Sequence, residues 1–211
     1  MSISLDGFVG GANGENEWIF PTMGEDVTTW IVETLETAGL HVMGRRTYHD
    51  MASYWPTSTS PFAASMNSIP KMVFTRSAVI ERPDLRLTTT ALKDASKAHG
   101  QTQQMAQPDE AICNLWLNPN VGGTDLVSEI GELKDSDGKP IVAHGGASFA
   151  ASLIEHNLVD EYHLIVHPVA LGQGLPIFDR LPNPLSMQLV ECRQFAGGAI
   201  AKVFEPNKIT Q

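Results

Sequence analysis

Two adjacent glycines, Gly145 and Gly146, stand between a short apolar run and a helical pattern in the sequence. Because neither carries a Cβ atom, the backbone can turn sharply there and an anion can reach the amides at the start of the helix. The pattern favours a phosphate site, although the pair could instead form only a tight turn. The residues that we assign to this site are Gly145, Gly146, Ala147, Ser148 and Phe149.

A second predicted phosphate site follows the strand-like run L-H-V-M at residues 40–43. Residues 1–44 contain no Lys or Arg, and Arg45 and Arg46 then come together directly after Gly44, where a helix is predicted to begin. Arg in the first turn opposes the helix dipole, so a bound anion would offset that cost. Guanidinium groups and the Thr47 hydroxyl can donate hydrogen bonds to phosphate oxygens. We therefore assign Gly44, Arg45, Arg46 and Thr47 to phosphate binding.

A third cluster directly follows the predicted strand 70–74 and consists of Thr75, Arg76 and Ser77. In an open parallel sheet, ligands lie outside the carboxyl ends of the strands. Two hydroxyls beside an Arg suit a monoester phosphate such as the 2′-phosphate of NADP. The alternative is that Arg76 is an ordinary surface residue.

The candidates for catalysis and substrate binding lie near the amino end. Asp6 and Trp18 fall in or beside a Gly-rich loop, and Asp26 is at the start of a predicted helix. Loops beside a sheet carry functional residues disproportionately, so we predict Asp6 and Asp26 as catalytic and Trp18 as substrate-binding. The alternatives are a turn-forming Asp6, a Trp18 that packs in a satellite core, and an Asp26 that caps its helix.

Composition excludes several classes of function. The net charge is −10 and the 14 basic residues are dispersed, which argues against nucleic acid as a partner. Cys113 and Cys192 are far apart, and on a strand His163 and His167 would lie about 13 Å from each other, so no metal site is expected. No apolar run approaches the length of a membrane span. We expect a soluble, cytoplasmic protein with reduced thiols.

Helical and strand-like patterns alternate along the chain, which predicts one α/β domain over residues 1–211. We expect a three-layer α/β/α arrangement with a mixed, mostly parallel central sheet and a C-terminal antiparallel hairpin. Residues 141–169 read as one βαβ unit, and residues 100–124 as an irregular segment and a possible insertion. The other expected helices are 25–38, 45–54, 91–99 and 126–133, and the other expected strands are 40–43, 70–74, 85–89, 187–195 and 199–205.

A hydrolase is one alternative to a phosphate-binding protein. Ser148 lies in G-A-S-F-A, which resembles a degenerate nucleophile elbow, and His156, His163 and His167 follow it. The chain is short for an α/β-hydrolase and the second glycine of the motif is missing. A basic rim would also have no role in acyl transfer.

Five segments of the sequence together resemble the dihydrofolate reductase-like superfamily. Within it they resemble the RibD C-terminal, riboflavin-biosynthesis reductase-like proteins that stand without a deaminase domain. The order and spacing of the matching segments carry the resemblance, which covers nearly the whole chain. They are S-L-D-G-F-V at 4–9, V-M-G-R-R-T-Y at 42–48, M-N-S-I-P-K-M-V-F-T-R-S at 66–77, L-V-D-E-Y-H-L-I-V-H-P-V-A-L-G-Q-G at 158–174 and P-I-F at 176–178.

The resemblance implies that NADPH binds across the rim of the sheet. It would place Gly44 to Thr47 on the cofactor's phosphates, Thr75 to Ser77 on the adenosine 2′-phosphate and Gly145 to Phe149 on the pyrophosphate. Family members reduce a ribose carbonyl of a pyrimidine intermediate, and the folate enzymes reduce a C=N bond. Leu164, Val166, Val203 and Phe204 also fall on apolar positions of the expected strands and leave more apolar edge than one small domain usually exposes, so we expect a homodimer, as is common in the family.

The hypothesis that follows is an NADPH-dependent reductase of a small heteroaromatic or carbonyl substrate, pterin-like or ribosylaminopyrimidine-like. One alternative is a non-catalytic nucleotide-binding protein that keeps the cofactor rim. The other is a folate reductase, in which Asp26 lies near the expected carboxylate although its spacing to Trp30 and Gly44 differs from the folate pattern.

Overall fold

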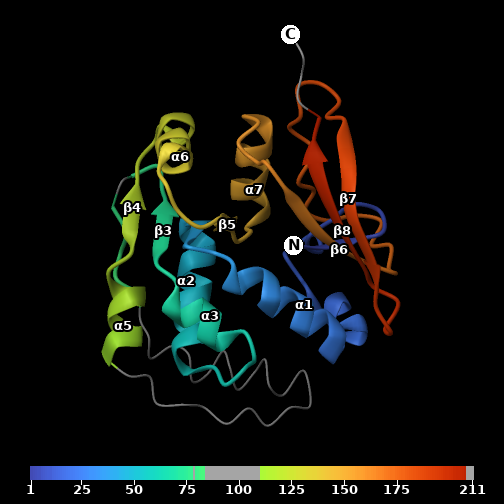
Figure 1. Ribbon diagram of the computed structural model, residues 1–211, viewed down its shortest axis with the longest axis horizontal. Coiled ribbons are helices and arrows are strands. Elements are labelled where there is room, and N and C mark those ends of the chain that lie inside the picture. Colours follow the sequence, from blue (N-terminus) through green and yellow to red (C-terminus); the bar gives the residue numbers. More distant parts are fainter. Residues whose placement is uncertain (78, 84–109, 208–211) are drawn as a thin grey trace. The chain divides into compact units, whose positions relative to one another are not determined.

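The computed structural model describes residues 1–77, 79–83 and 110–207. The chain divides into two compact units, one built from residues 1–30 and 145–211 and the other from residues 31–144. The described part of each unit contains a four-stranded sheet with helices (Figure 1). The α/β class is confirmed, and the strands are divided between two hydrogen-bonded sheets.

The sheet of the second unit is entirely parallel. Its order is β4 (Asn120–Gly122), β3 (Lys71–Phe74), β2 (Leu40–Gly44) and β5 (Ile141–Ala143). Gly44 pairs in register with Phe74, and Phe74 with Gly122, so neighbouring strands end at the same level. A Cβ atom on Gly122 would lie 2.6 Å from the Phe74 ring, so the close approach of β4 to β3 requires glycine there.

An aromatic core holds the helices of this unit to its sheet. Tyr48 and Trp116 pack with Met43 and Val73 in one buried cluster. The Tyr48 hydroxyl donates to the Trp116 carbonyl, and Trp116 Nε1 donates to Asn67 Oδ1 at 2.8 Å. The helical segments are α2 (Arg45–Tyr54), η2 (Trp55–Thr57), α3 (Ala63–Ser68), α5 (Glu110–Leu117) and α6 (Leu126–Asp135), and α1 (Glu25–Glu36) leads into the unit.

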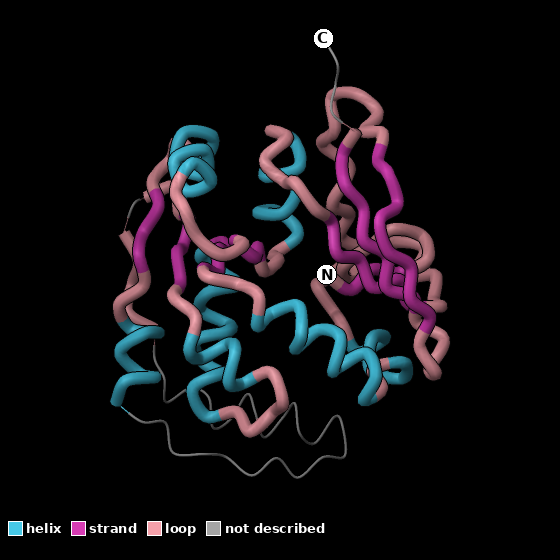
Figure 2. Tube along the Cα trace, in the orientation of Figure 1, coloured by secondary structure: helices cyan, strands magenta, loops and turns pink. Residues whose placement is uncertain are grey.

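The sheet of the first unit is mixed, in the order β1-β6-β8-β7. Strand β1 (Ser2–Ser4) runs parallel to β6 (Tyr162–His167), while β8 (Ile200–Pro206) is antiparallel to both β6 and β7 (Met187–Gln194). The β7–β8 hairpin is the pair of long neighbouring strands in Figure 2. Helix α7 (Ala147–Glu155) packs on one face of β6, and η1 (Glu17–Thr22) precedes α1.

Most of the expected elements are confirmed to within a few residues, but two expectations are wrong. Strands β5 and β6 do not form one βαβ unit, because β5 pairs with β2 whereas β6 pairs with β1 and β8. Residues 110–122 are not irregular: they form α5 and β4, and Trp116 is fully buried. The strand expected at 85–89, the helix expected at 91–99 and residues 100–109 lie outside the described residues.

Buried bases lie on β2 and β3 of the parallel sheet. His41 and Lys71 are adjacent in register and are 0% and 2% exposed. Neither ring nitrogen of His41 has a hydrogen-bond partner among the described residues, and its ring centroid is 4.3 Å from that of His144. Burial, together with the charge of Lys71, lowers the pKa of His41 to about 4, and burial lowers the pKa of Lys71 to about 7. Burial therefore disfavours the protonated, charged form of both side chains in the folded state.

We predict that the protein loses stability between pH 6.5 and pH 4 because of His41. Its pKa in the unfolded chain is higher than in the folded chain, so the unfolded state binds the proton first as the pH falls. A lowering from 6.5 to about 4 corresponds to about 3 kcal/mol of unfolding free energy. Urea denaturation at several pH values should show this loss in the wild type and a smaller loss in His41→Met. The exposed His156→Gln control should behave as the wild type, and an unchanged acid loss in His41→Met would contradict the assignment.

Candidate functional site

The carboxyl ends of β2 and β3 bring the two arginine-containing clusters to one edge of the parallel sheet. Helix α2 begins at Arg45, directly after Gly44, and has neither a side-chain cap nor an acidic residue in its first turn. Arg45 and Arg46 are exposed. The first amides of α2 therefore remain available for an anion.

The neighbouring strand supplies the hydroxyl groups of the predicted 2′-phosphate site. The hydroxyl oxygens of Thr75 and Ser77 are 3.2 Å apart, and Ser77 Oγ donates to the Val79 carbonyl at 3.0 Å. Arg76 between them is exposed. The register of Gly44 with Phe74 thus brings Thr75 to Ser77 to the same sheet edge as the start of α2.

In the other unit, α7 begins with an open amino end. Gly146 is its N-cap, with φ +41° and no side-chain cap. The amides of Phe149 and Ala150 donate to the Gly146 carbonyl at 3.0 and 3.1 Å, which leaves the amides of Ala147 and Ser148 without an intrahelical acceptor. The residues present fit a phosphate group, because no side chain caps these amides.

The two glycines of this cradle differ in what they require. A side chain at Gly146 would be strained, since its φ lies in the left-handed region. An added Cβ at Gly145 would meet only the Met1 Cε atom, at 3.6 Å, which is an ordinary contact. Gly145 is therefore the position at which a ligand effect can be separated from a folding effect.

Asp6 ties the first loop to the Gly-rich loop after β6. Its carboxylate accepts from the Ser4 hydroxyl at 2.7 Å and from the amides of Leu171 and Gly172 at 3.1 and 2.7 Å. The Ser4 hydroxyl and then these amides lower the pKa of Asp6 to about 2. The contact joins the segments S-L-D-G and A-L-G-Q-G, and it favours a bracing role for Asp6 over proton donation.

Asp26 has a similar arrangement at the start of α1. Its Oδ2 atom accepts from the Ala196 amide at 2.8 Å, and its Oδ1 atom from the Val27 amide at 2.9 Å. The Ala196 hydrogen bond is the main cause that lowers the pKa of Asp26. The side chain holds α1 to the turn between β7 and β8, and it is not an open carboxylate.

Trp18 lies beside a buried histidine that sequence reasoning did not select for this role. Its ring is edge-on to His167, with centroids 5.5 Å apart. His167 Nδ1 is 2.6 Å from Thr22 Oγ1, and His167 Nε2 is 3.0 Å from Ser2 Oγ. Burial lowers the pKa of His167. Its position at the end of a strand, in V-H-P, was the available signal, but the hydroxyl partners are distant in sequence.

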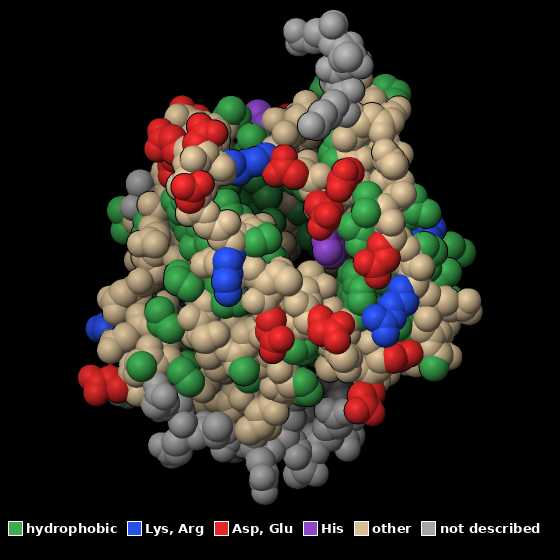
Figure 3. Space-filling view, in the orientation of Figure 1, with side chains coloured by type: hydrophobic (Ala, Val, Ile, Leu, Met, Phe, Trp, Pro, Cys, Tyr) green, Lys and Arg blue, Asp and Glu red, His purple; other side chains and the backbone are tan. Residues whose placement is uncertain are grey.

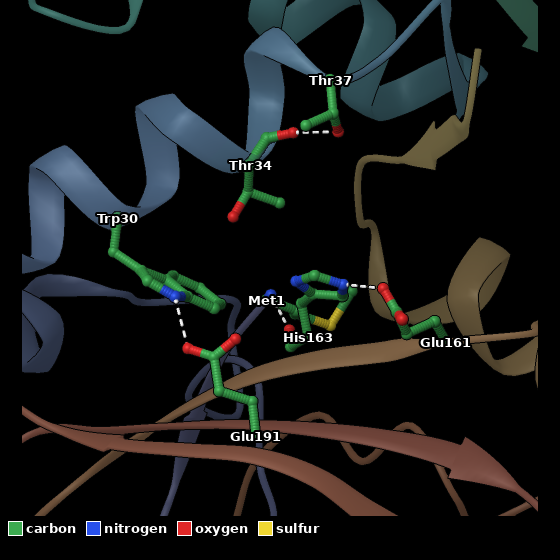
Figure 4. Close-up of polar contacts among 7 residues, drawn as sticks. All are labelled: Met1, Trp30, Thr34, Thr37, Glu161, His163 and Glu191. Atoms are coloured by element: carbon green, nitrogen blue, oxygen red, sulfur yellow. Dashed lines mark hydrogen bonds and ion pairs between the residues drawn. The ribbon is translucent and has the colours of Figure 1, made fainter.

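A second cluster that the sequence did not reveal joins α1, β7 and the start of β6 (Figure 4). His163 Nε2 pairs with Glu161 Oε1, and the ring faces Trp30 with centroids 5.7 Å apart. Trp30 Nε1 donates to Glu191 Oε1 at 3.3 Å. Val190 is the extra residue of a β-bulge, since Leu189 pairs with Phe204 and Glu191 with Val203. His163 also pairs with Val203, so one row across the sheet carries Glu191, Val203 and His163.

The geometry does not favour a hydrolase. His156 Nδ1 contacts the Ser152 carbonyl at 2.8 Å, and His163 and His167 are engaged with other partners. None of them hydrogen-bonds Ser148 in the described part of the chain. Among the same residues, no group of three or more His, Cys, Asp or Glu could hold a metal ion, and no helix has the length and apolarity needed to cross a membrane.

Comparison with known proteins identifies the family. Residues 1–201 match the RibD C-terminal domain. The chain belongs to this family. It is 26% identical to the uncharacterized protein YyaP of Bacillus subtilis (strain 168) over 209 residues, which are 98% of this chain and 93% of YyaP.

Solved structures show the same fold. A protein of Shewanella sp. PV-4, named for riboflavin biosynthesis, matches with a TM-score of 0.68 and 20% identity, covering 99% of this chain and 97% of that one. A dihydrofolate reductase of Enterococcus faecalis, complexed with NADP(H), matches with a TM-score of 0.54 and 15% identity, covering 98% of this chain and 94% of that one. The chain thus has a dihydrofolate reductase-like fold, and its family supports a reductase-type enzyme.

Proposed function

We propose that the protein is an NADPH-dependent reductase that transfers a hydride to a small heteroaromatic or carbonyl substrate, pterin-like or ribosylaminopyrimidine-like. The observation that carries this proposal is the start of α2, where Arg45 and Arg46 follow Gly44 with no capping side chain and no acid in the first turn. An anion there would offset two cations at the positive end of a helix dipole. Such an anion suits a cofactor rich in phosphate.

Each predicted segment has a part in holding the cofactor. Gly44 to Thr47 would bind phosphate oxygens through amides, guanidinium groups and a hydroxyl, and Thr75 to Ser77 would bind the 2′-phosphate. Gly145 to Phe149 would bind pyrophosphate oxygens through the amides of Ala147 and Ser148. Bound NADPH would supply the hydride. Trp18 remains our candidate for contact with the substrate.

The charge of the protein supports a specific anion site. Acidic side chains are spread over the face drawn in Figure 3, with few Lys or Arg among them. The net charge of −10 would repel a polyanion in general. A nucleotide cofactor must therefore be held by local donors, which the starts of α2 and α7 offer.

A non-catalytic nucleotide-binding protein is the second candidate. It is favoured by the engagement of Asp6 and Asp26, whose carboxylates accept backbone amides and offer no free acid. The same contact at Asp26 weighs against a folate reductase that would use this carboxylate on its substrate. NADPH oxidation by the purified protein against dihydrofolate, pterins, ribosylaminopyrimidines and quinones discriminates these functions. Tight NADPH binding with no turnover of any of them would favour the second candidate.

We predict that Gly145→Ala weakens NADPH binding at least tenfold and leaves the melting temperature nearly unchanged. A Cβ there has room in the protein but would crowd a phosphate on the α7 amides. Calorimetric titration and thermal melting on the same sample test this. Gly138→Ala, at a glycine with open space around it, is the matched control and should change neither quantity. Unchanged NADPH affinity in Gly145→Ala would remove the pyrophosphate cradle from the proposal.

We predict that Arg76→Ala reduces the preference for NADPH over NADH by roughly tenfold, because a charge-assisted hydrogen bond to the 2′-phosphate is lost. Titration of both cofactors against the variant measures this preference. Arg82→Ala replaces another exposed arginine of the same unit and should keep the wild-type preference. If Arg76→Ala also kept the wild-type preference for NADPH over NADH, Arg76 would not bind the 2′-phosphate.

We also propose a homodimer, on grounds that differ from those first expected. Leu164 and Val203 are buried within their own unit and cannot supply an interface. Strand β7 ends the order of its sheet, and Leu189 and Val190 on it are 49% and 52% exposed. An exposed apolar edge strand is commonly covered by a partner. Light scattering should give twice the chain mass of 22.9 kDa, and Val190→Lys should shift it towards the monomer. A monomeric wild type at micromolar concentration would contradict the proposal.

A further inference from the structure

The short helical segment η1, which carries Trp18, has little apolar anchorage. None of its residues is buried, and Asn16, which precedes it, provides no side-chain cap. Trp18 Nε1 donates to the Glu15 carbonyl at 3.1 Å, which is a contact within the same stretch of chain. Apolar burial therefore contributes little to fixing η1, and polar contacts with the sheet must set its position.

His167, at the end of β6, makes such a contact. Its side chain is 0% exposed. His167 Nδ1 lies 2.6 Å from the hydroxyl of Thr22, the last residue of η1, and His167 Nε2 lies 3.0 Å from the hydroxyl of Ser2 on β1. One buried imidazole thereby joins β6 and β1 to η1, although Thr22 is 145 residues away in sequence.

The chemistry of the imidazole suits this role. Burial lowers the pKa of His167, so the ring is neutral near pH 7. A neutral imidazole has one N–H donor and one acceptor nitrogen, and it can therefore bond a hydroxyl on each side. Because the ring is buried, moving Thr22 away would leave a polar atom without a partner, which costs free energy. The pair of hydrogen bonds thus resists displacement of η1.

The same ring also contacts Trp18 directly. The two ring centroids are 5.5 Å apart at an interplanar angle of 84°, the edge-on arrangement that aromatic pairs prefer. Trp18 is only partly buried, so part of its indole surface stays accessible to a ligand. A Cβ atom on Gly197 would lie 3.1 Å from the Thr22 carbonyl oxygen, so the turn between β7 and β8 also packs closely on the end of η1. The sheet thus fixes both Trp18 and the end of its segment.

We propose that His167 is a positioning residue for substrate binding: it holds the end of η1 through Thr22 and thereby keeps the Trp18 ring against the substrate. This inference rests on the proposed function, in which Trp18 contacts the substrate. His167 itself touches neither substrate nor cofactor and exchanges no proton with them, because both of its nitrogens are occupied. Loss of the contact should therefore raise the KM of the substrate and leave kcat and NADPH affinity nearly unchanged.

The test uses the substrate from the panel above that the wild type reduces fastest. Thr22→Val keeps the shape of the side chain but removes its hydroxyl, so the substrate KM should rise roughly fivefold, as expected for one lost hydrogen bond. His167→Phe keeps a buried ring and should raise KM at least as much. Thr22→Ser keeps a hydroxyl and should restore a KM near that of the wild type. Thr28→Val is the matched control, since the Thr28 hydroxyl donates to the Gly24 carbonyl at 2.9 Å, and it should leave KM unchanged.

A double variant separates positioning of Trp18 from a general loss of structure. Trp18→Leu removes the ring that His167 positions and should itself raise the substrate KM. If the Thr22 hydroxyl acts through that ring, adding Thr22→Val to Trp18→Leu should raise KM no further. A purely structural effect would add to that of Trp18→Leu, and that result would overturn the inference.

The outcomes also separate the inference from the proposed function. If the wild type reduces no substrate of the panel, the proposed function fails and this inference fails with it. If the wild type is active and both Thr22→Val and His167→Phe keep KM within about twofold, only the inference fails. A loss of NADPH affinity in Thr22→Val would overturn it too, because the effect would not be confined to the substrate. Thr22 is only partly buried, so Thr22→Val keeps the test open should His167→Phe not fold.

Discussion

The open amino ends of α2 and α7 are the features on which this account of the protein depends. A helix start normally satisfies its first amides with a side chain, yet Gly146 offers none and the amides of Ala147 and Ser148 are left over. The start of α2 repeats the arrangement with two arginines in place of acids. Each is unfavourable for the isolated chain and becomes favourable when an anion binds. That physical cost is the reason to regard these turns as parts of a cofactor site.

Two further segments of the resemblance have structural roles within the first unit. Asp6 accepts three hydrogen bonds and thereby fixes the first loop against the loop that follows β6. A Cβ atom on Gly174 would lie 2.3 Å from the Gly10 carbonyl oxygen, so the same two loops approach too closely for any other residue. The charged side chain and the glycine act together, and both loops are held beside the carboxyl ends of β1 and β6.

The sequence predicted what depends on local pattern. The apolar spacing of α1, the glycine-led starts of α2 and α7 and the strands β2, β3 and β6 are all visible in short windows. The division of the strands into two sheets was not visible in short windows, because whether β5 pairs with β6 depends on contacts between distant segments. The helix at 110–117 was missed because it is short and precedes Asn-Pro-Asn, although Trp116 within it is a core residue.

The same distinction applies to the candidate site. Gly145, Arg45 and Arg76 could be selected from their neighbours in the chain, since each follows a strand and precedes a helix or turn. The contacts of Trp30 with His163 and Glu191 could not, because they depend on the register of three strands and on one bulge. Asp26 was selected for its position on α1, but its amide partner at Ala196 is 170 residues away and changes its role.

The most direct test of the central claim is a crystal structure of the protein with NADPH bound. The account predicts that pyrophosphate oxygens lie within about 3.2 Å of the amide nitrogens of Ala147 and Ser148. NADPH ordered elsewhere on the protein, with those two amides in contact only with water, would contradict it.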